Sequence, residues 1–135
     1  MQLRYAFFAG DVQERPGGQY EFQDMANGRQ VPAFPADVFV ACVLVTERTE
    51  TDDVESLDVS VHVFAPASQA AAGTAMRVPT RSRVRAPRCG SMPGYEYVPV
   101  DVQFTAPHAG AYEIHVERSG VVWYLGFYRL ELNGH

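Results

Sequence analysis

The stretch PHAGAYEIHVE, residues 107–117, carries the strongest fold signal in the chain and also holds two of its four histidines. Pro107 and Gly110 indicate a turn, and from Tyr112 onward apolar and polar residues alternate, as in a strand with one face on a core. In β-sandwiches a tyrosine placed just after such a turn buries its ring and returns its hydroxyl to nearby backbone, an arrangement called a tyrosine corner. The stretch therefore predicts a structural corner at Tyr112.

The competing interpretation of this stretch is a metal or acid–base site. His115 shares the outward face with Glu113 and Glu117, and a neighbouring strand could add His62. A protein metal site needs at least three converging ligands, whereas any exposed polar strand face contains such triples. HExxH-like and CxxC spacings are absent from the sequence. We therefore expect no bound metal and no cofactor.

The remainder of the chain is dominated by valine, aromatic residues and period-two alternation, and it contains no amphipathic helix. Strands are predicted at 3–9, 19–24, 37–46, 56–64, 98–105, 111–117 and 121–132, with a short eighth at 75–78. Only residues 68–73 would permit a helical turn. The length of 135 residues fits one domain. The expected fold is all-β: a single-domain antiparallel immunoglobulin-like β-sandwich over residues 1–135, with about seven or eight strands.

Two of these strands are apolar on both faces, although a sandwich supplies only one interior. The strand 37–46 has this property throughout, and the strand 121–132 has it at its start unless Gly126 marks a bulge that resets the alternation. Either a second molecule or a lid formed by residues 65–97 must cover the extra face. We favour a homodimer. Its expected interface residues are Phe39, Val43, Trp123 and Phe127.

Five of the eleven basic residues, all of them arginine, lie in RVPTRSRVRAPRCG, residues 77–90. Such a segment could bind phosphate or another anion. The candidate residues are Arg81, Arg83, Arg85 and Arg88. Because the net charge is −5, we favour a solvated loop, or one offset by the acidic run 47–55, and do not expect nucleic-acid binding.

The cysteines and the N-terminus indicate the compartment. No apolar run is long enough to span a membrane, and the first residues lack the pattern of a signal peptide. We therefore expect a cytoplasmic protein in which Cys42 and Cys89 are free thiols. Cys42 lies within a predicted strand, whereas Cys89 follows Arg88, which would lower its pKa and increase its reactivity.

Two segments carry a resemblance to a known family. The opening LRYAFFAGDVQERPGGQYEF, residues 3–22, and the later APHAGAYEIHV, residues 106–116, resemble those of a family of small bacterial proteins common in actinobacteria. Its members begin with a similar strand, turn and Gly-rich hairpin. The resemblance implies an immunoglobulin-like β-sandwich without an assigned activity, and it transfers no catalytic residues. The arginine-rich middle of the chain departs from the family pattern.

These observations favour a non-enzymatic interaction or assembly module that forms a homodimer or binds another protein. The alternative is a small enzyme or ligand-binding protein, whose pocket would involve His62, His115, Tyr95 or Cys89. These four residues would then have to converge in one concave pocket. No known catalytic or nucleotide-binding fingerprint supports the alternative.

Overall fold

The protein is described by a computed structural model over residues 2–47, 59–66, 76–89, 94–118 and 120–134. Its regular structure consists of strands, and the described residues include no helix that could cross a membrane. In chain order the strands are β1 (Gln2–Ala9), β2 (Asp11–Glu14), β3 (Tyr20–Gln23), β4 (Gly28–Val31), β5 (Ala36–Glu47), β6 (Val59–Phe64), β7 (Arg77–Val78), β8 (Thr80–Val84), β9 (Arg88–Cys89), β10 (Tyr95–Ala106), β11 (Gly110–Arg118) and β12 (Val121–Leu132).

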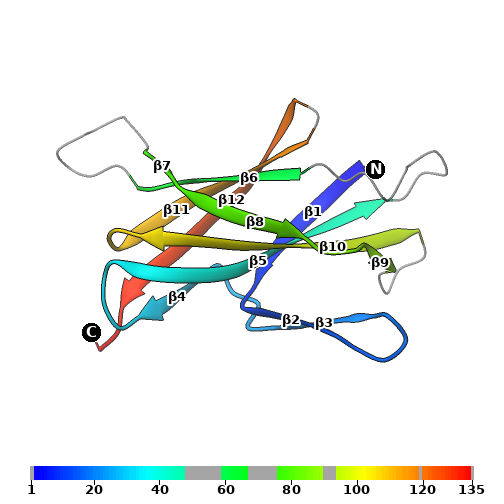
Figure 1. The fold of residues 1–135 in the computed structure, drawn as a ribbon, viewed down its shortest axis with the longest axis horizontal. Coiled ribbons are helices and arrows are strands. Elements are labelled where there is room, and N and C mark those ends of the chain that lie inside the picture. The colour runs from blue at the N-terminus through cyan, green and yellow to red at the C-terminus, as the bar shows by residue number, and fades with distance from the viewer. Residues whose placement is uncertain (1, 48–58, 67–75, 90–93, 119, 135) are drawn as a thin grey trace.

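The strands form two sheets and a separate hairpin (Figure 1). The first sheet has the order β1-β5-β10-β8, with β9 also paired to β10. The second sheet has the order β4-β12-β11-β6-β7. All the pairings are antiparallel except that of β12 with β4. The expected all-β, mostly antiparallel architecture is therefore confirmed.

The main core lies between the two sheets and is built by the alternation that the sequence shows. Val38, Val40, Cys42 and Leu44 of β5 point inward, as do Tyr112, Ile114 and Val116 of β11. These side chains are almost completely buried. Because alternate residues of a strand point to opposite faces, the polar residues of β11 are left on the outer face of the second sheet.

The tyrosine corner predicted at Tyr112 is confirmed. The Tyr112 hydroxyl donates a hydrogen bond to the His108 carbonyl oxygen at 2.6 Å and lies 3.3 Å from the His108 backbone nitrogen, which donates to it. The side chain is fully buried, and burial raises the pKa of its hydroxyl, an effect that the backbone hydrogen bond partly opposes. The corner thus fixes the turn between β10 and β11.

Gly110 is needed at this corner for two reasons. Its φ is 137°, which side-chain-bearing residues rarely adopt, and a Cβ there would lie 2.6 Å from Pro66 Cγ. We expect Gly110→Ala to destabilise the fold by about 2 kcal/mol through combined strain and overpacking. The matched control is Gly120→Ala, because Gly120 also has a positive φ but has open space around it. If thermal unfolding shows that the two variants lose equal stability, a steric role for Pro66 is contradicted.

The second face of β5 is covered for the most part by the hairpin β2–β3, a cover that the sequence pattern did not indicate. Ala41 and Val43 of β5 form a second buried cluster with Ala9 and Val12. Aromatic side chains close this cluster: Phe7, Tyr20, Phe22 and Tyr97. The hairpin buries this part of β5 together with Tyr97, the last residue of the segment 65–97. Figure 1 shows the hairpin as an arm beside the first sheet.

Gly126 marks a bulge in β12, as the sequence suggested. The register between β11 and β12 shifts between Ile114 and His115, where β12 contributes an extra residue. Before the bulge Trp123 packs toward the core, and after it Tyr128 does so. The bulge therefore moves Phe127 to the outer face, where it contacts Tyr124, and the first half of β12 carries apolar residues on both faces.

The other strand predictions agree with the structure at different levels. Each of the seven main predicted ranges contains an observed strand, although residues 56–58 lie outside the described part of the chain, as does the helix-permissive segment 68–73. The predicted eighth strand corresponds to β7. The short strands β2, β4, β8 and β9 were not predicted.

Candidate functional site

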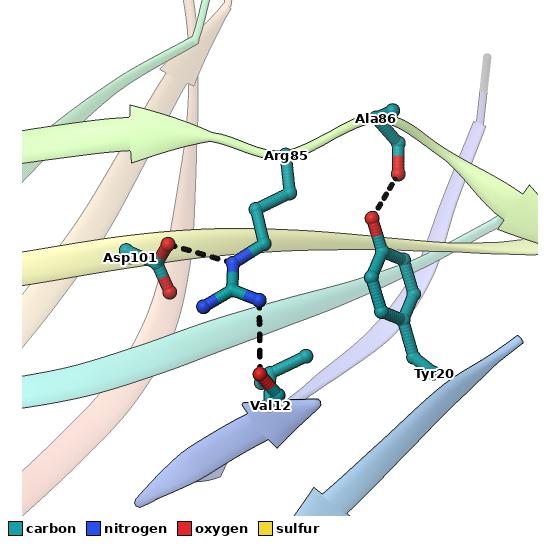
Figure 2. A network of polar contacts seen from close by, with 5 residues as sticks. All are labelled: Val12, Tyr20, Arg85, Ala86 and Asp101. Atoms are coloured by element: carbon teal, nitrogen blue, oxygen red, sulfur yellow. Dashed lines mark hydrogen bonds and ion pairs between the residues drawn. The ribbon is translucent and has the colours of Figure 1, made fainter. Parts of the chain in front are cut away.

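The hairpin is held to the first sheet by polar contacts that also shape a groove beside it (Figure 2). Arg85 Nε donates to Asp101 Oδ2 at 2.7 Å, and Arg85 Nη1 donates to the Val12 carbonyl oxygen at 2.9 Å. The Tyr20 hydroxyl donates to the Ala86 carbonyl oxygen at 2.6 Å. The pKa of Arg85 is raised above its ordinary value, mainly because of its hydrogen bond to Asp101. Arg85 is therefore a charged structural residue that joins the hairpin to β10.

The arginine-rich segment is not a loop, which corrects the expectation. Residues Thr80–Val84 form the edge strand β8, paired with β10. Arg81 and Arg83 lie exposed on this strand, whereas Arg85 and Arg88 are paired with Asp101 and Glu14. Apart from Glu47, which pairs with Arg4, the acidic run 47–55 lies outside the described residues.

The four predicted interface residues occupy four different environments. Val43 is completely buried beneath the hairpin, and Trp123 packs, partly buried, against the main core. Phe39 is 56% exposed on the outer face of the first sheet. Phe127 is 52% exposed on the outer face of the second sheet. The two exposed phenylalanines therefore lie on opposite sides of the molecule.

Phe127 belongs to a row of rings across the outer face of the second sheet, which we call the aromatic stripe. It consists of Phe64, His115, Tyr124 and Phe127, with successive ring centroids 4.9, 5.4 and 5.9 Å apart. Tyr124 is 54% exposed, as is Val122 on the same strand face. Tyr124 was not predicted as part of an interface, because only the bulge at Gly126 places it on the same face as Phe127.

The histidines of this face are arranged for hydrogen bonding. His62 lies directly across from His115 in the β6–β11 register. Arg77 donates to His62 Nδ1, and His62 Nε2 lies 2.9 Å from Glu117 Oε2. Because a guanidinium can only donate, Nδ1 is the acceptor and Nε2–H donates to Glu117. Both ring nitrogens of His62 are thus engaged.

His115 has a weaker partner, and nothing at this face resembles a metal centre. His115 Nε2 lies 3.3 Å from Glu113 Oε1, outside hydrogen-bonding geometry. No group of three or more potential ligand side chains that could hold a metal ion occurs within the described residues. The absence of bound metal at His62 and His115 remains a prediction, which elemental analysis of untagged protein would test.

The alternative pocket residues are not brought together. His62 and His115 lie on the second sheet, whereas Tyr95 begins β10 and Cys89 ends β9 in the first sheet. The structure describes the backbone at Cys89 but not its side chain. The groove and end cavity described next include none of these four residues in their linings.

Two hollows stand out in the described part of the chain. One is a groove of about 420 Å³ on the outer face of the first sheet, beside β2 and β8. The other is a cavity of about 510 Å³ at one end of the sandwich, near Pro66 and His108. Its lining includes Pro66 and Met76, the described residues on either side of the gap at 67–75.

Comparisons with known proteins give no match. No protein-family model, no curated protein and no solved structure is similar to this chain. The class that the structure itself defines is an all-β protein of two packed sheets. The resemblance to the actinobacterial family remains a prediction, because no comparison tests it.

Cys42 is an unpaired thiol in the centre of the main core. Burial raises the pKa of its thiol to about 12, and the thiolate is the reactive form. We therefore expect an alkylating reagent to modify Cys42 only when the protein unfolds. Mass spectrometry of the peptide containing Cys42, after labelling with and without denaturant, measures this. Rapid labelling of the native protein would contradict the placement of Cys42 in the core.

Proposed function

We propose that the protein is a non-enzymatic interaction module that pairs with a second copy of itself through the outer face of the second sheet. The observation that supports the proposal is the aromatic stripe, which leaves Tyr124 and Phe127 more than half exposed. Contiguous apolar patches of this kind mark protein–protein contacts more often than free surface. Tyrosine and phenylalanine are also enriched at the centre of interfaces.

The charges around the aromatic stripe suit a second copy. Glu113 lies across from Phe127, and Arg129 lies two residues further along β12, opposite Ala111. Glu113 and Arg129 therefore flank Phe127 in two directions, Glu113 across to β11 and Arg129 along β12. In a two-fold pair whose axis passes near Phe127 and bisects these two directions, each Glu113 would face the partner's Arg129. Opposite charges that meet in this way fix the orientation of the two copies relative to each other.

The first sheet is a poorer candidate for this contact. Most of the apolar residues on its outer face lie beneath the hairpin, and the exposed rings of Phe39 and Tyr5 are far apart, since Tyr5 lies opposite Val45, six residues along β5 from Phe39. Single exposed apolar residues are normal on monomeric proteins. Val43 and Trp123 are therefore left out of the proposed interface.

We further propose that the fold is immunoglobulin-like and that the protein works in the cytoplasm. The tyrosine corner at Tyr112 supports the fold assignment. The unpaired Cys42 fits a reducing compartment, where disulfides are rare.

Light scattering during a dilution series tests the proposed pairing. We expect a dimer at high concentration that dissociates over about a hundredfold dilution, as mass action requires. Phe127→Glu should give a monomer, because it places a charge at the centre of the contact. The matched control is Phe39→Glu, which makes the same change on the other sheet and should leave the mass unchanged. A monomer at the highest concentration, or loss of the dimer only in Phe39→Glu, would contradict the proposal.

A further inference from the structure

The groove on the first sheet has a defined shape and an uneven charge. Its floor is formed by Phe39 and Ala41 of β5 together with Gln103 of β10, one wall by β2, and the other by the arginines of β8. From this arrangement we propose that the groove binds a small organic phosphate, a phosphate monoester whose ester group is apolar and preferably aromatic. This site lies on the opposite sheet from the proposed dimer contact and does not depend on it.

Two guanidinium groups on the β8 wall have no partner of their own. Arg81 pairs with Gln103 and Arg83 with Asp101 in the β8–β10 register, so both side chains share the outer face of the sheet. Alternate residues of one strand are about 7 Å apart. Neither side chain makes a hydrogen bond or ion pair with any residue that the structure describes. Both are therefore free to converge on one anion.

The other charged residues of the groove offset only part of the positive charge of these two arginines. Three arginines (Arg81, Arg83 and Arg85) and two aspartates (Asp11 and Asp101) line the groove, which gives 3 − 2 = +1. Asp101 is paired with Arg85, and Asp11 accepts a hydrogen bond from Gln13 Nε2 at 3.1 Å. The whole chain carries a net charge of −5. A positive groove is thus set into a negative protein, as suits an anionic ligand.

A phosphate group fits this wall better than a neutral ligand would. Guanidinium groups present planar N–H donors that match the oxygens of a phosphate, and the charged hydrogen bonds are about twice as strong as neutral ones. A monoester phosphate has three such oxygens, which is enough to accept from Arg81 and Arg83 together. Asp37 lies two residues before Phe39 on the same outer face. Its Oδ1 accepts a hydrogen bond from the Thr105 hydroxyl at 2.9 Å.

The apolar floor indicates the remainder of the ligand. Phe39 lies directly across from Gln103 in the β5–β10 register, which places its exposed ring beside the β8 arginines. A flat apolar group attached to the phosphate would cover this ring. The volume of about 420 Å³ falls within the range of small-molecule sites. Arg85 keeps the β2 wall in place through its bond to the Val12 carbonyl.

Titration of phenyl phosphate into isotope-labelled protein, followed by NMR, tests the proposal. We expect saturable shifts at residues of β5, β8 and β10, with weaker binding of inorganic phosphate and none of benzyl alcohol. Arg81→Gln and Arg83→Gln should each weaken the binding of phenyl phosphate about tenfold or more, because each removes charged hydrogen bonds. Phe39→Ser should weaken the binding of phenyl phosphate but leave the binding of inorganic phosphate unchanged.

The matched control is Arg118→Gln, which removes the same charge from the second sheet and should leave the affinity unchanged. Because Arg81, Arg83 and Phe39 are exposed, their replacement leaves the core intact, and unchanged thermal unfolding verifies this. Binding should persist in the monomeric Phe127→Glu variant, which separates this site from the proposed pairing. The proposal is overturned if phenyl phosphate shows no saturable binding, or if Arg118→Gln weakens it as much as Arg81→Gln does.

Discussion

Tyr112→Ala is expected to lower the free energy of unfolding by about 4 kcal/mol, the usual cost of removing a fully buried aromatic side chain. The Tyr112 ring is completely buried and lies 5.4 Å from the ring of Phe104, centroid to centroid. Its loss would leave a cavity in the main core and would also remove the hydroxyl that holds the turn at His108. Denaturant unfolding followed by the fluorescence of Trp123 measures the change.

Tyr112→Phe separates packing from hydrogen bonding at the same position. This variant keeps the ring and loses only the hydrogen bonds with His108, so it should cost about 1–2 kcal/mol. An unchanged melting temperature in Tyr112→Ala would show that the corner does not stabilise the fold.

Phe22→Ala is expected to lower the free energy of unfolding by about 3 kcal/mol, near the low end for a buried phenylalanine. Phe22 stands at the centre of the contact between the hairpin and the first sheet. Its ring centroid lies 5.1 Å from that of Phe7 and 5.1 Å from that of Tyr97, both edge-on. Without it the hairpin would cover Val43 poorly. Chemical denaturation gives the change in stability, and hydrogen exchange shows whether β5 becomes less protected.

The control for Phe22→Ala is the same substitution at Phe39. Phe39 lies on the sheet face that the hairpin partly covers but is 56% exposed, so its replacement should change stability by no more than about 0.5 kcal/mol. If the two variants lose equal stability, the hairpin is not a specific cover for β5.

The sequence predicted best those features that depend on local pattern. Alternation along β11 and the turn at Gly110 were enough to predict the tyrosine corner, because both signals lie within one short stretch. β5 is apolar on both faces, so its pattern could not show which face points into the main core and which lies under the hairpin. Gly126 indicated the bulge, but only the register of β12 against β11 shows which side chains it moves outward.

The features that escaped prediction depend on contacts between distant segments. The hairpin covers β5 through residues far apart in the chain, such as Phe22 and Tyr97. Only residues 19–24 of it were predicted as a strand, and no local signal shows where a hairpin packs. β8 was expected to be a loop because its arginines lack apolar alternation. Its strand structure comes from its pairing with β10, and an edge strand can carry charged side chains on its exposed face.

The most direct test of the proposed interface is a charge exchange between Glu113 and Arg129, measured by analytical ultracentrifugation. Glu113→Arg and Arg129→Glu should each weaken pairing about tenfold or more, because each brings like charges together across the two-fold axis. The double variant restores opposite charges and should recover most of the wild-type dimer affinity. Single variants with wild-type affinity, or a double variant weaker than both, would contradict pairing through the outer face of the second sheet.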